Sequence, residues 1–237
     1  MSDNDLAGRV RDGDRRSLAR LITAIEAADP DAETVVTSLI DSNVPPARKV
    51  GITGPPGAGK STLVNAMVTD LRSRGDTVAV LAVDPSSPIT GGALLGDRIR
   101  MQDHAGDPDV YVRSMASRGH LGGLSVAAAP AIAAMARAGF DLVLVETVGV
   151  GQSELEVMDH VDVVVLVLGP GWGDQIQADK AGIVEIADVF VVNKGDRPGV
   201  DTVHRALLER WGGSAAPVLI TTAITGEGVP ELVEVIR

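Results

Sequence analysis

Residues 50–61, VGITGPPGAGKS, hold the most informative pattern in this 237-residue chain. From Gly54 to Ser61 they match GxxxxGK[ST], a loop that joins a buried strand to the start of a helix. Its glycines let successive backbone N–H groups face one anion, and the helix N-terminus adds a favourable dipole. An apolar run precedes the loop and a helical pattern follows it. The stretch therefore predicts a site for the phosphates of a nucleotide.

Two side chains at the end of this loop carry specific chemistry. Lys60 supplies a positive charge to the terminal phosphates, which makes it a candidate catalytic residue, and the Ser61 hydroxyl can ligate Mg²⁺. We expect the nucleotide to be bound by the whole loop and the first residues of the helix: Gly54, Pro55, Pro56, Gly57, Ala58, Gly59, Lys60, Ser61 and Thr62.

From Lys49 onward, apolar runs alternate with amphipathic stretches. Runs that are nearly continuous in Val, Leu and Ile are expected of parallel strands buried on both faces by helices. The alternation favours right-handed βαβ units and a mostly parallel, doubly wound sheet, so the chain is predicted to be an α/β protein with a three-layer P-loop NTPase fold. The expected strands are 50–53, 78–83, 110–112, 142–145, 163–168, 189–192 and 218–220; the expected helices are 60–74, 124–138, 175–187, 200–211 and 227–237.

A second motif indicates which base is bound. Asn193-Lys194-Gly195-Asp196 follows the apolar run 189–192, as NKxD does in GTP-binding proteins. The Asp196 carboxylate can accept hydrogen bonds from the ring N–H and the exocyclic amino group of guanine, a pair of donors that adenine lacks. The Lys194 stem can lie over the base, and Asn193 can brace the loop. After the next strand, Thr222 and Ala223 lie where a backbone N–H contacts the guanine oxygen, so GTP and GDP are the expected ligands.

Acidic residues follow several of the expected strands. Glu146 ends the run 142–145, and Asp84 ends the run 78–83. Acids at the carboxyl edge of a parallel sheet, beside the phosphate loop, are placed to hold Mg²⁺ directly or through water. Asp97 is a third candidate. Each acid taken alone could equally be a helix cap or a turn residue, but three at one edge favour a metal site.

Residues 146–152 suggest how hydrolysis could occur. The Gly149 N–H could contact the γ-phosphate and act as a switch, and Gln152 is a candidate for orienting the attacking water. Arg98 and Arg100 could either stabilise charge on the transferred phosphate or face solvent. A GTPase with no supplied arginine finger turns over slowly, on the order of 10⁻⁴–10⁻² s⁻¹. A scaffold that binds GTP and hydrolyses it negligibly remains an alternative.

The first 45 residues follow a different pattern. Apolar residues recur at helical spacing between Leu6 and Ile25, and a second short helical pattern runs from Val35 to Ile40. Asp29-Pro30 separates the two, and Pro45-Pro46 ends the segment. We therefore expect an N-terminal helical appendage at residues 1–45, followed by a P-loop GTPase domain at 46–237.

The composition argues against several classes of function. The formal net charge is −11, from 21 basic and 32 acidic residues, so nucleic acid and anionic membranes are poor candidates for partners. There are no cysteines, which excludes disulfides and thiol catalysis and fits a reducing cytoplasm. The N-terminus is polar and charged, unlike a signal peptide, and the alanine-rich run 124–138 is too short to span a bilayer. We expect a cytoplasmic protein.

Six motifs in order carry a family resemblance: GPPGAGKST (54–62), VLAVDPSSP (80–88), GGALLGDRIRM (91–101), VETVGVGQSE (145–154), GDQIQADKAG (173–182) and VVNKGD (191–196). Together they resemble the MeaB/ArgK family of GTPases over nearly the whole chain. The resemblance implies a metallochaperone of an adenosylcobalamin-dependent acyl-CoA mutase, which gates cofactor loading, protects the mutase from inactivation and is stimulated by it.

The same resemblance implies roles for individual residues. It assigns Mg²⁺ to Ser61, Asp84, Asp97 and Glu146, and mutase sensing to the segment that holds Asp174, Gln177 and Lys180. It also implies a possible homodimer, which longer members form through a C-terminal helical arm. Residues 169–172, Gly-Pro-Gly-Trp, differ from the family pattern. The client could therefore be an ethylmalonyl-, isobutyryl- or hydroxyisobutyryl-CoA mutase instead of the methylmalonyl-CoA enzyme.

Two rival functions share parts of this pattern. A nickel-insertion GTPase has the same fold, but usually presents Cys or His ligands. This chain has no cysteine, and its four histidines are isolated along the sequence. A transport-linked ATPase or kinase is the older interpretation attached to the ArgK name, and Asp196 argues against it.

Overall fold

A computed structural model describes residues 3–85, 102–104, 106–117, 123–147, 156–172, 185–211 and 216–237. Seven strands lie at the seven predicted apolar runs, and they follow one another in the sheet as β3-β2-β4-β1-β5-β6-β7. The pairs β2–β3, β1–β5, β5–β6 and β6–β7 are parallel, so the predicted α/β P-loop fold with a parallel sheet is confirmed. The strands are β1 (Arg48–Thr53), β2 (Val78–Pro85), β3 (Val110–Ser117), β4 (Leu142–Thr147), β5 (Val163–Leu168), β6 (Val189–Asn193) and β7 (Val218–Thr221).

The helices within the described ranges also follow the predicted pattern. They are α1 (Asp3–Arg11), α2 (Arg15–Glu26), α3 (Pro30–Ile40), α4 (Lys60–Ser73), α6 (Gly123–Ala136), α10 (Val200–Trp211) and α11 (Val229–Ile236), with a short 3₁₀ helix at Gln102–His104. Most of the helix expected at 175–187 lies outside the described residues. None of the described helices is long and apolar enough to cross a membrane.

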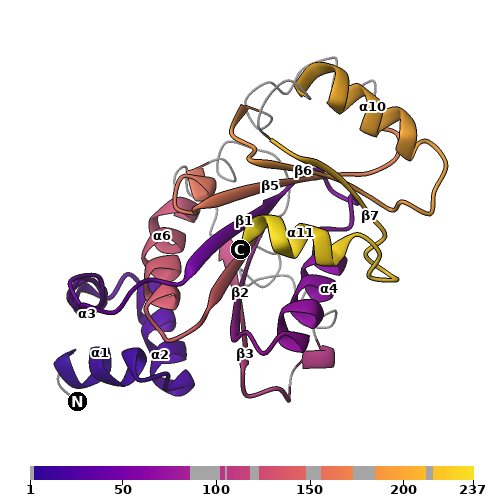
Figure 1. The fold of residues 1–237 in the computed structure, drawn as a ribbon. Helices are drawn as coiled ribbons and strands as arrows, with labels where there is room; N and C mark the ends of the chain where they lie inside the picture. The colour runs from indigo at the N-terminus through magenta and orange to yellow at the C-terminus, as the bar shows by residue number, and fades with distance from the viewer. Residues whose placement is uncertain are drawn as a thin grey trace. The chain divides into compact units, whose positions relative to one another are not determined.

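The chain divides into two compact units, of which the first contains residues 1–49 and 75–145. Its N-terminal part is a set of three helices, and α2 and α3 both pack against α6 (Figure 1). The pattern between Leu6 and Ile25 forms two helices, because Gly13 adopts φ +84° and Asp14 caps the next helix. Asp29 and Pro30 separate α2 from α3, as the sequence indicated; Asp29 caps α3 by accepting from the Asp31 N–H, and Pro30 lies in the first turn.

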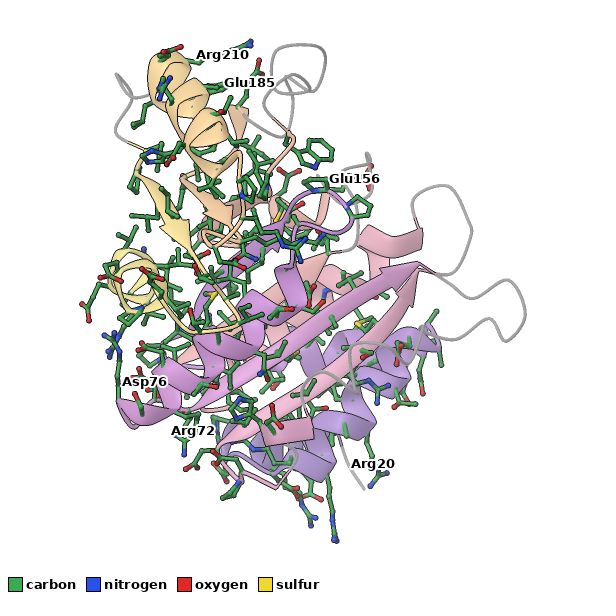
Figure 2. The ribbon with its side chains drawn as sticks, turned by 90° about the vertical axis from the view of Figure 1, so that its right-hand side faces the viewer. Arg20, Arg72, Asp76, Glu156, Glu185 and Arg210 are labelled. Atoms are coloured by element: carbon green, nitrogen blue, oxygen red, sulfur yellow. The ribbon has the colours of Figure 1, made fainter. Side chains whose placement is uncertain are left out.

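The second unit contains residues 50–74 and 146–237 and includes most of the predicted nucleotide-binding residues. Its strands β5 and β6 are buried along their whole length. On one side they pack on α10, the helix that carries Arg210 (Figure 2). The guanidinium carbon of Arg210 lies 4.8 Å from the centre of the Trp211 ring. The buried cluster there consists of Leu166, Leu168, Phe190, Val192, Val200, Val203 and Leu207.

Helix α11 closes this unit against α4 (Figure 1). Arg74, directly after α4, bonds the carboxylates of Asp70 and Glu234. Hydrogen bonds to Glu234 and Asp70 raise the pKa of the Arg74 guanidinium. The helix that begins with the phosphate-loop lysine is therefore held at its far end by charge pairs as well as by packing.

Candidate nucleotide-binding site

The phosphate loop connects β1 to α4, and its backbone requires glycine at two points. Gly54 has φ +140°, and a Cβ there would lie 2.1 Å from the carbonyl oxygen of Val167. Gly59 has φ +94°, and its Cβ would lie 2.4 Å from Nδ2 of Asn193. Any larger residue at either position would collide with β5 or with the guanine motif. The loop is therefore packed tightly on the strand and the motif that flank it.

Lys60 is buried, with 6% of its surface exposed, and its side chain turns back onto its own loop. Its Nζ donates hydrogen bonds to the carbonyl oxygens of Gly54 at 2.7 Å and Pro55 at 3.1 Å. These bonds hold an ammonium charge against the first half of the loop. Lys60 Nζ therefore lies inside the phosphate loop, where it can donate hydrogen bonds to an anion that the backbone of the loop binds.

Ser61 and Glu146 meet next to the loop. The Ser61 hydroxyl donates a 2.6 Å hydrogen bond to Oε1 of Glu146, and both residues are buried. A hydroxyl and a carboxylate are oxygen ligands of the kind that Mg²⁺ takes in nucleotide sites. The residues that the structure describes there therefore fit a magnesium ion.

The remaining candidates for metal binding and hydrolysis are not placed with them. The backbone of Asp84 belongs to β2, but its side chain is not among those described. Asp97, Gly149 and Gln152 lie outside the described residues. Within the described ranges, no group of three or more His, Cys, Asp or Glu side chains could hold a metal ion.

Asn193, the first residue of the guanine motif, joins three segments of this unit. Its Nδ2 donates to the carbonyl oxygen of Ala58 at 3.0 Å. Its Oδ1 accepts from the Thr221 hydroxyl and from the backbone N–H of Ala223, both at 3.1 Å. Asn193 is 2% exposed, so these are buried bonds that link the phosphate loop to the loop after β7. The predicted bracing role of Asn193 matches this geometry.

Lys194 adopts a backbone conformation that is rare outside glycine, with φ +65°. Such a conformation costs an L-residue roughly 1–2 kcal/mol and is maintained only where the surroundings require it. Here Nζ donates a 2.6 Å hydrogen bond to the carbonyl oxygen of Gly57. The lysine stem therefore runs from the guanine motif to the phosphate loop.

A pocket lies beside the phosphate loop and the guanine motif, and six of its lining residues were predicted from the sequence. Asp196, which is exposed, is one of its lining residues. Two further residues, Arg197 and Ile224, were not predicted, although each directly follows a predicted one in the chain. The pocket is lined by Gly59, Thr62, Asn193, Lys194, Asp196, Arg197, Ala223 and Ile224.

The loop after β7 uses its first two backbone N–H groups within the protein. Thr222 N–H donates to the carbonyl oxygen of Glu227 at 2.9 Å, and Ala223 N–H donates to Asn193. A guanine oxygen that approached Ala223 would therefore share this N–H with the asparagine. The three residues expected to sense a partner, Asp174, Gln177 and Lys180, lie outside the described part of the chain.

Comparison with known proteins adds relatives in three kinds of organism. A protein of Pyrococcus horikoshii is 49% identical over 245 residues, which cover 99% of this chain and 76% of that protein. The Escherichia coli protein named GTPase ArgK is 45% identical over 191 residues, covering 79% of this chain and 58% of its own. The mouse protein named methylmalonic aciduria type A homolog, mitochondrial, is 37% identical over 248 residues, covering 95% and 60%.

Solved structures support the same fold. The structure described as an LAO/AO transport system kinase superposes with a TM-score of 0.75 at 30% identity, covering 99% of this chain and 73% of that one. The nickel complex of HypB from Helicobacter pylori has a TM-score of 0.58 at 12% identity over 86% of this chain and 90% of its own, a likeness of fold alone. A family model described as methylmalonyl-CoA mutase-associated GTPase MeaB matches residues 18–237. The chain thus belongs to the MeaB family of GTPases.

Proposed function

We propose that this chain is a Mg²⁺-dependent GTPase that serves as a chaperone of an adenosylcobalamin-dependent acyl-CoA mutase, gating cofactor loading and protecting the mutase. The observation that carries the nucleotide part is the link between the two motifs. Asn193 and Lys194 bond the carbonyl oxygens of Ala58 and Gly57. These bonds connect two carbonyl groups of the phosphate loop to the guanine motif. The residues proposed to bind the base and those proposed to bind the phosphates are therefore held in a fixed arrangement.

In this proposal, the phosphate loop binds the nucleotide through its backbone N–H groups and Lys60. The Lys60 ammonium, now bonded to Gly54 and Pro55, would exchange these carbonyls for the terminal phosphate oxygens. The exchange replaces neutral acceptors by charged ones, which form stronger hydrogen bonds. The loop is thereby suited to a triphosphate or a diphosphate.

Ser61 and Glu146 would hold Mg²⁺, with Asp84 and Asp97 as further proposed ligands or water-binding groups. When bound, the ion neutralises charge on the β- and γ-phosphates during transfer. Ser61 lies at the start of α4 and Glu146 in β4, so both oxygens are carried by regular elements rather than by loops. Gln152 is the residue that we propose to orient the attacking water, and the Gly149 N–H to contact the γ-phosphate.

Guanine specificity is assigned to Asp196. Asp196 is exposed and lines the pocket, where its carboxylate can accept two hydrogen bonds from the guanine edge. Adenine has an acceptor nitrogen where guanine has the ring N–H, so it cannot donate these two hydrogen bonds to the carboxylate. We therefore expect GTP and GDP to bind and ATP not to compete.

The mutase part of the proposal rests on relatives. The family is described as methylmalonyl-CoA mutase-associated, and the mouse relative is named for methylmalonic aciduria. We propose that Asp174, Gln177 and Lys180 sense the mutase, as the family resemblance implies. We further propose that the mutase accelerates a slow intrinsic hydrolysis.

Two experiments test these parts separately. Titration with GTP, ATP and GDP in the presence of Mg²⁺ tests the nucleotide assignment; competition by ATP at equal strength would favour the transport-kinase alternative. The second experiment measures GTP turnover with and without each candidate mutase, for the original chain and for Lys180→Ala. Arg20→Ala, at an exposed position on α2, is the matched control. Equal stimulation of both variants would remove Lys180 from the sensing role.

A further inference from the structure

The four residues that follow β5, Gly169 to Trp172, form a tight turn. The Trp172 N–H donates to the carbonyl oxygen of Gly169 at 3.4 Å, and Gly171 has φ +92°. Proline at the second position and a glycine with positive φ at the third are typical of a type II turn. This turn, which we call the β5 turn, fixes the place of Trp172 relative to the end of β5.

The β5 turn lies close to two parts of the nucleotide-binding unit. A Cβ at Gly169 would lie 3.8 Å from Cα of Ala58 in the phosphate loop. A Cβ at Gly199, the residue before α10, would lie 3.8 Å from Cβ of Pro170. Each distance is an ordinary van der Waals contact for one added methyl group. The turn therefore lies near both the phosphate loop and the start of α10.

Trp172 is half-buried against the cluster formed by β5, β6 and α10. The chain has only five aromatic residues, which are two Trp, two Phe and one Tyr. Three of them, Trp172, Phe190 and Trp211, belong to this cluster or pack against it. Because a tryptophan covers a large apolar area with few rotatable bonds, Trp172 attaches the β5 turn firmly to the strand that ends in Asn193.

This attachment gives a role to the stretch Gly169 to Trp172, which departs from the family pattern. Asp174, the first residue proposed to sense the mutase, comes two positions after Trp172 in the chain. A mutase can alter hydrolysis only if its contacts displace groups near the nucleotide. Well-packed side chains transmit such a displacement, whereas a loosely held turn would absorb it.

We infer that Trp172 is a positioning residue that couples mutase binding to the nucleotide site, an inference that rests on the proposed function. It acts by holding the β5 turn close to the phosphate loop. Such coupling is reciprocal: if the mutase changes the affinity for a nucleotide, that nucleotide changes the affinity for the mutase by the same factor. The coupling can therefore be measured from the mutase side.

The test measures the Kd for the mutase that stimulates turnover, once with GDP and once with a non-hydrolysable GTP analogue, both with Mg²⁺. For the unaltered chain the two Kd values should differ by about 5- to 150-fold. In Trp172→Ala the ratio should fall to about twofold or less, and Trp172→Phe should restore most of it. Basal turnover and the Kd for GDP should change by less than about threefold, because Asn193 and Lys194 still bond the phosphate loop.

Trp211→Ala is the matched control, since it removes the other tryptophan that packs on the same cluster, at the end of α10. It should lower the melting temperature as Trp172→Ala does and leave the ratio unchanged. A spectroscopic arm uses Trp211→Phe, which leaves Trp172 as the only tryptophan. Its emission maximum should lie at a shorter wavelength in the folded chain than in urea, because the indole is half-buried.

A Trp172→Ala chain that kept the original ratio would overturn the inference while the proposed function stands. The same holds if Trp211→Ala lost the ratio equally, or if the emission of Trp172 were the same in the folded chain and in urea. If no candidate mutase stimulated the unaltered chain, the mutase part of the proposed function would fail, and this inference with it.

Discussion

The Ser61 hydroxyl donates a 2.6 Å hydrogen bond to Oε1 of Glu146, although 85 residues separate them in the chain. This length is typical of a hydroxyl bonded to a carboxylate anion, a bond roughly twice as strong as one between neutral groups. Both side chains are at most 5% exposed. The contact therefore joins the first turn of α4 to the end of β4 through two oxygen atoms that a magnesium ion could bind.

The first prediction concerns Glu146→Gln, which keeps the shape of the side chain and removes its charge. A neutral amide still accepts from Ser61 but is a poorer ligand for Mg²⁺. Hydrolysis should fall by about tenfold or more, while the Kd for GDP should change by less than about threefold, because the phosphate loop still binds the diphosphate. Single-turnover and equilibrium binding measurements as a function of Mg²⁺ check both values.

Glu231→Gln serves as the control, since Glu231 is an exposed acid on α11 of the same unit. It should leave both quantities unchanged. If Glu146→Gln turned over at the original rate at saturating Mg²⁺, Glu146 would be a structural partner of Ser61 and not a magnesium ligand.

The second prediction concerns Asn193→Ala, which removes the buried link between the two loops. The Thr221 hydroxyl and the Ala223 N–H would lose their acceptor in a site where Thr221 is 0% exposed. Each unsatisfied buried group costs about 1–3 kcal/mol, so the free energy of unfolding should fall by roughly 2–4 kcal/mol. Urea unfolding of the nucleotide-free protein measures this change.

A matched substitution is Asn43→Ala, at an exposed position before β1. Its urea midpoint should equal that of the original chain. A midpoint for Asn193→Ala that also stayed unchanged would mean that the three segments are held together without the asparagine.

Strand β3 is longer than its sequence pattern predicts. Its apolar run predicted only residues 110–112, but the strand continues to Ser117, paired with β2 up to Pro85. Arg113 and Ser114 interrupt the apolar pattern, and β3 is the last strand at its end of the sheet. An edge strand need not be buried on both faces, so its hydrogen bonds extend beyond its apolar residues. The strands β5 and β6, buried throughout, were predicted within one residue at each end.

In the nucleotide-binding site, too, only some of the features could be predicted from the sequence. The phosphate loop and Asn193 were predicted because they belong to the motifs GxxxxGK[ST] and NKxD, whose residues have a fixed spacing in the sequence. The positive φ of Lys194 and the exposure of Ile224 have no signal in the sequence, since both arise from how the loops after β6 and β7 turn. The turn after β7, which contains Ile224, is closed by hydrogen bonds from the N–H groups of Thr225 and Gly226 to the carbonyl oxygen of Thr222. No sequence motif predicts these bonds.

A third prediction concerns pH and the N-terminal helices. Asp14 caps α2 by accepting from the N–H groups of Arg16 and Ser17 and from the Ser17 hydroxyl. The backbone hydrogen bond from Arg16, followed by the Ser17 hydroxyl, holds the pKa of the Asp14 carboxyl below its usual range. Its charge therefore stabilises the folded state above about pH 4, and this contribution is lost as pH falls through the lowered pKa.

Asp14→Asn keeps an acceptor at the cap but does not titrate. The melting temperature of the original chain should exceed that of Asp14→Asn at pH 7, and the difference should shrink toward pH 3. Asp12→Asn, at an exposed residue outside the helix, should show no such pH-dependent difference. If the difference in melting temperature between the original chain and Asp14→Asn were the same at pH 3 and pH 7, the proposed stabilisation by the Asp14 charge would be wrong.

The last prediction concerns the base specificity of Asp196. In Asp196→Asn the amide places a donor where guanine also presents a donor and where xanthine has an oxygen, so the preferred nucleotide should change from GTP to xanthosine triphosphate. A site built to hydrogen-bond one pattern rejects the other by a large factor, so the ratio of the two Kd values should shift by about 10³-fold or more. The two loops should remain linked, because Asn193 and Lys194 keep their bonds to the phosphate loop. Lys60→Ala distinguishes phosphate binding from base recognition, since it should weaken the binding of both triphosphates equally. Competition titration of the two triphosphates gives the ratio directly, and an Asp196→Asn variant that still preferred GTP would place guanine recognition elsewhere.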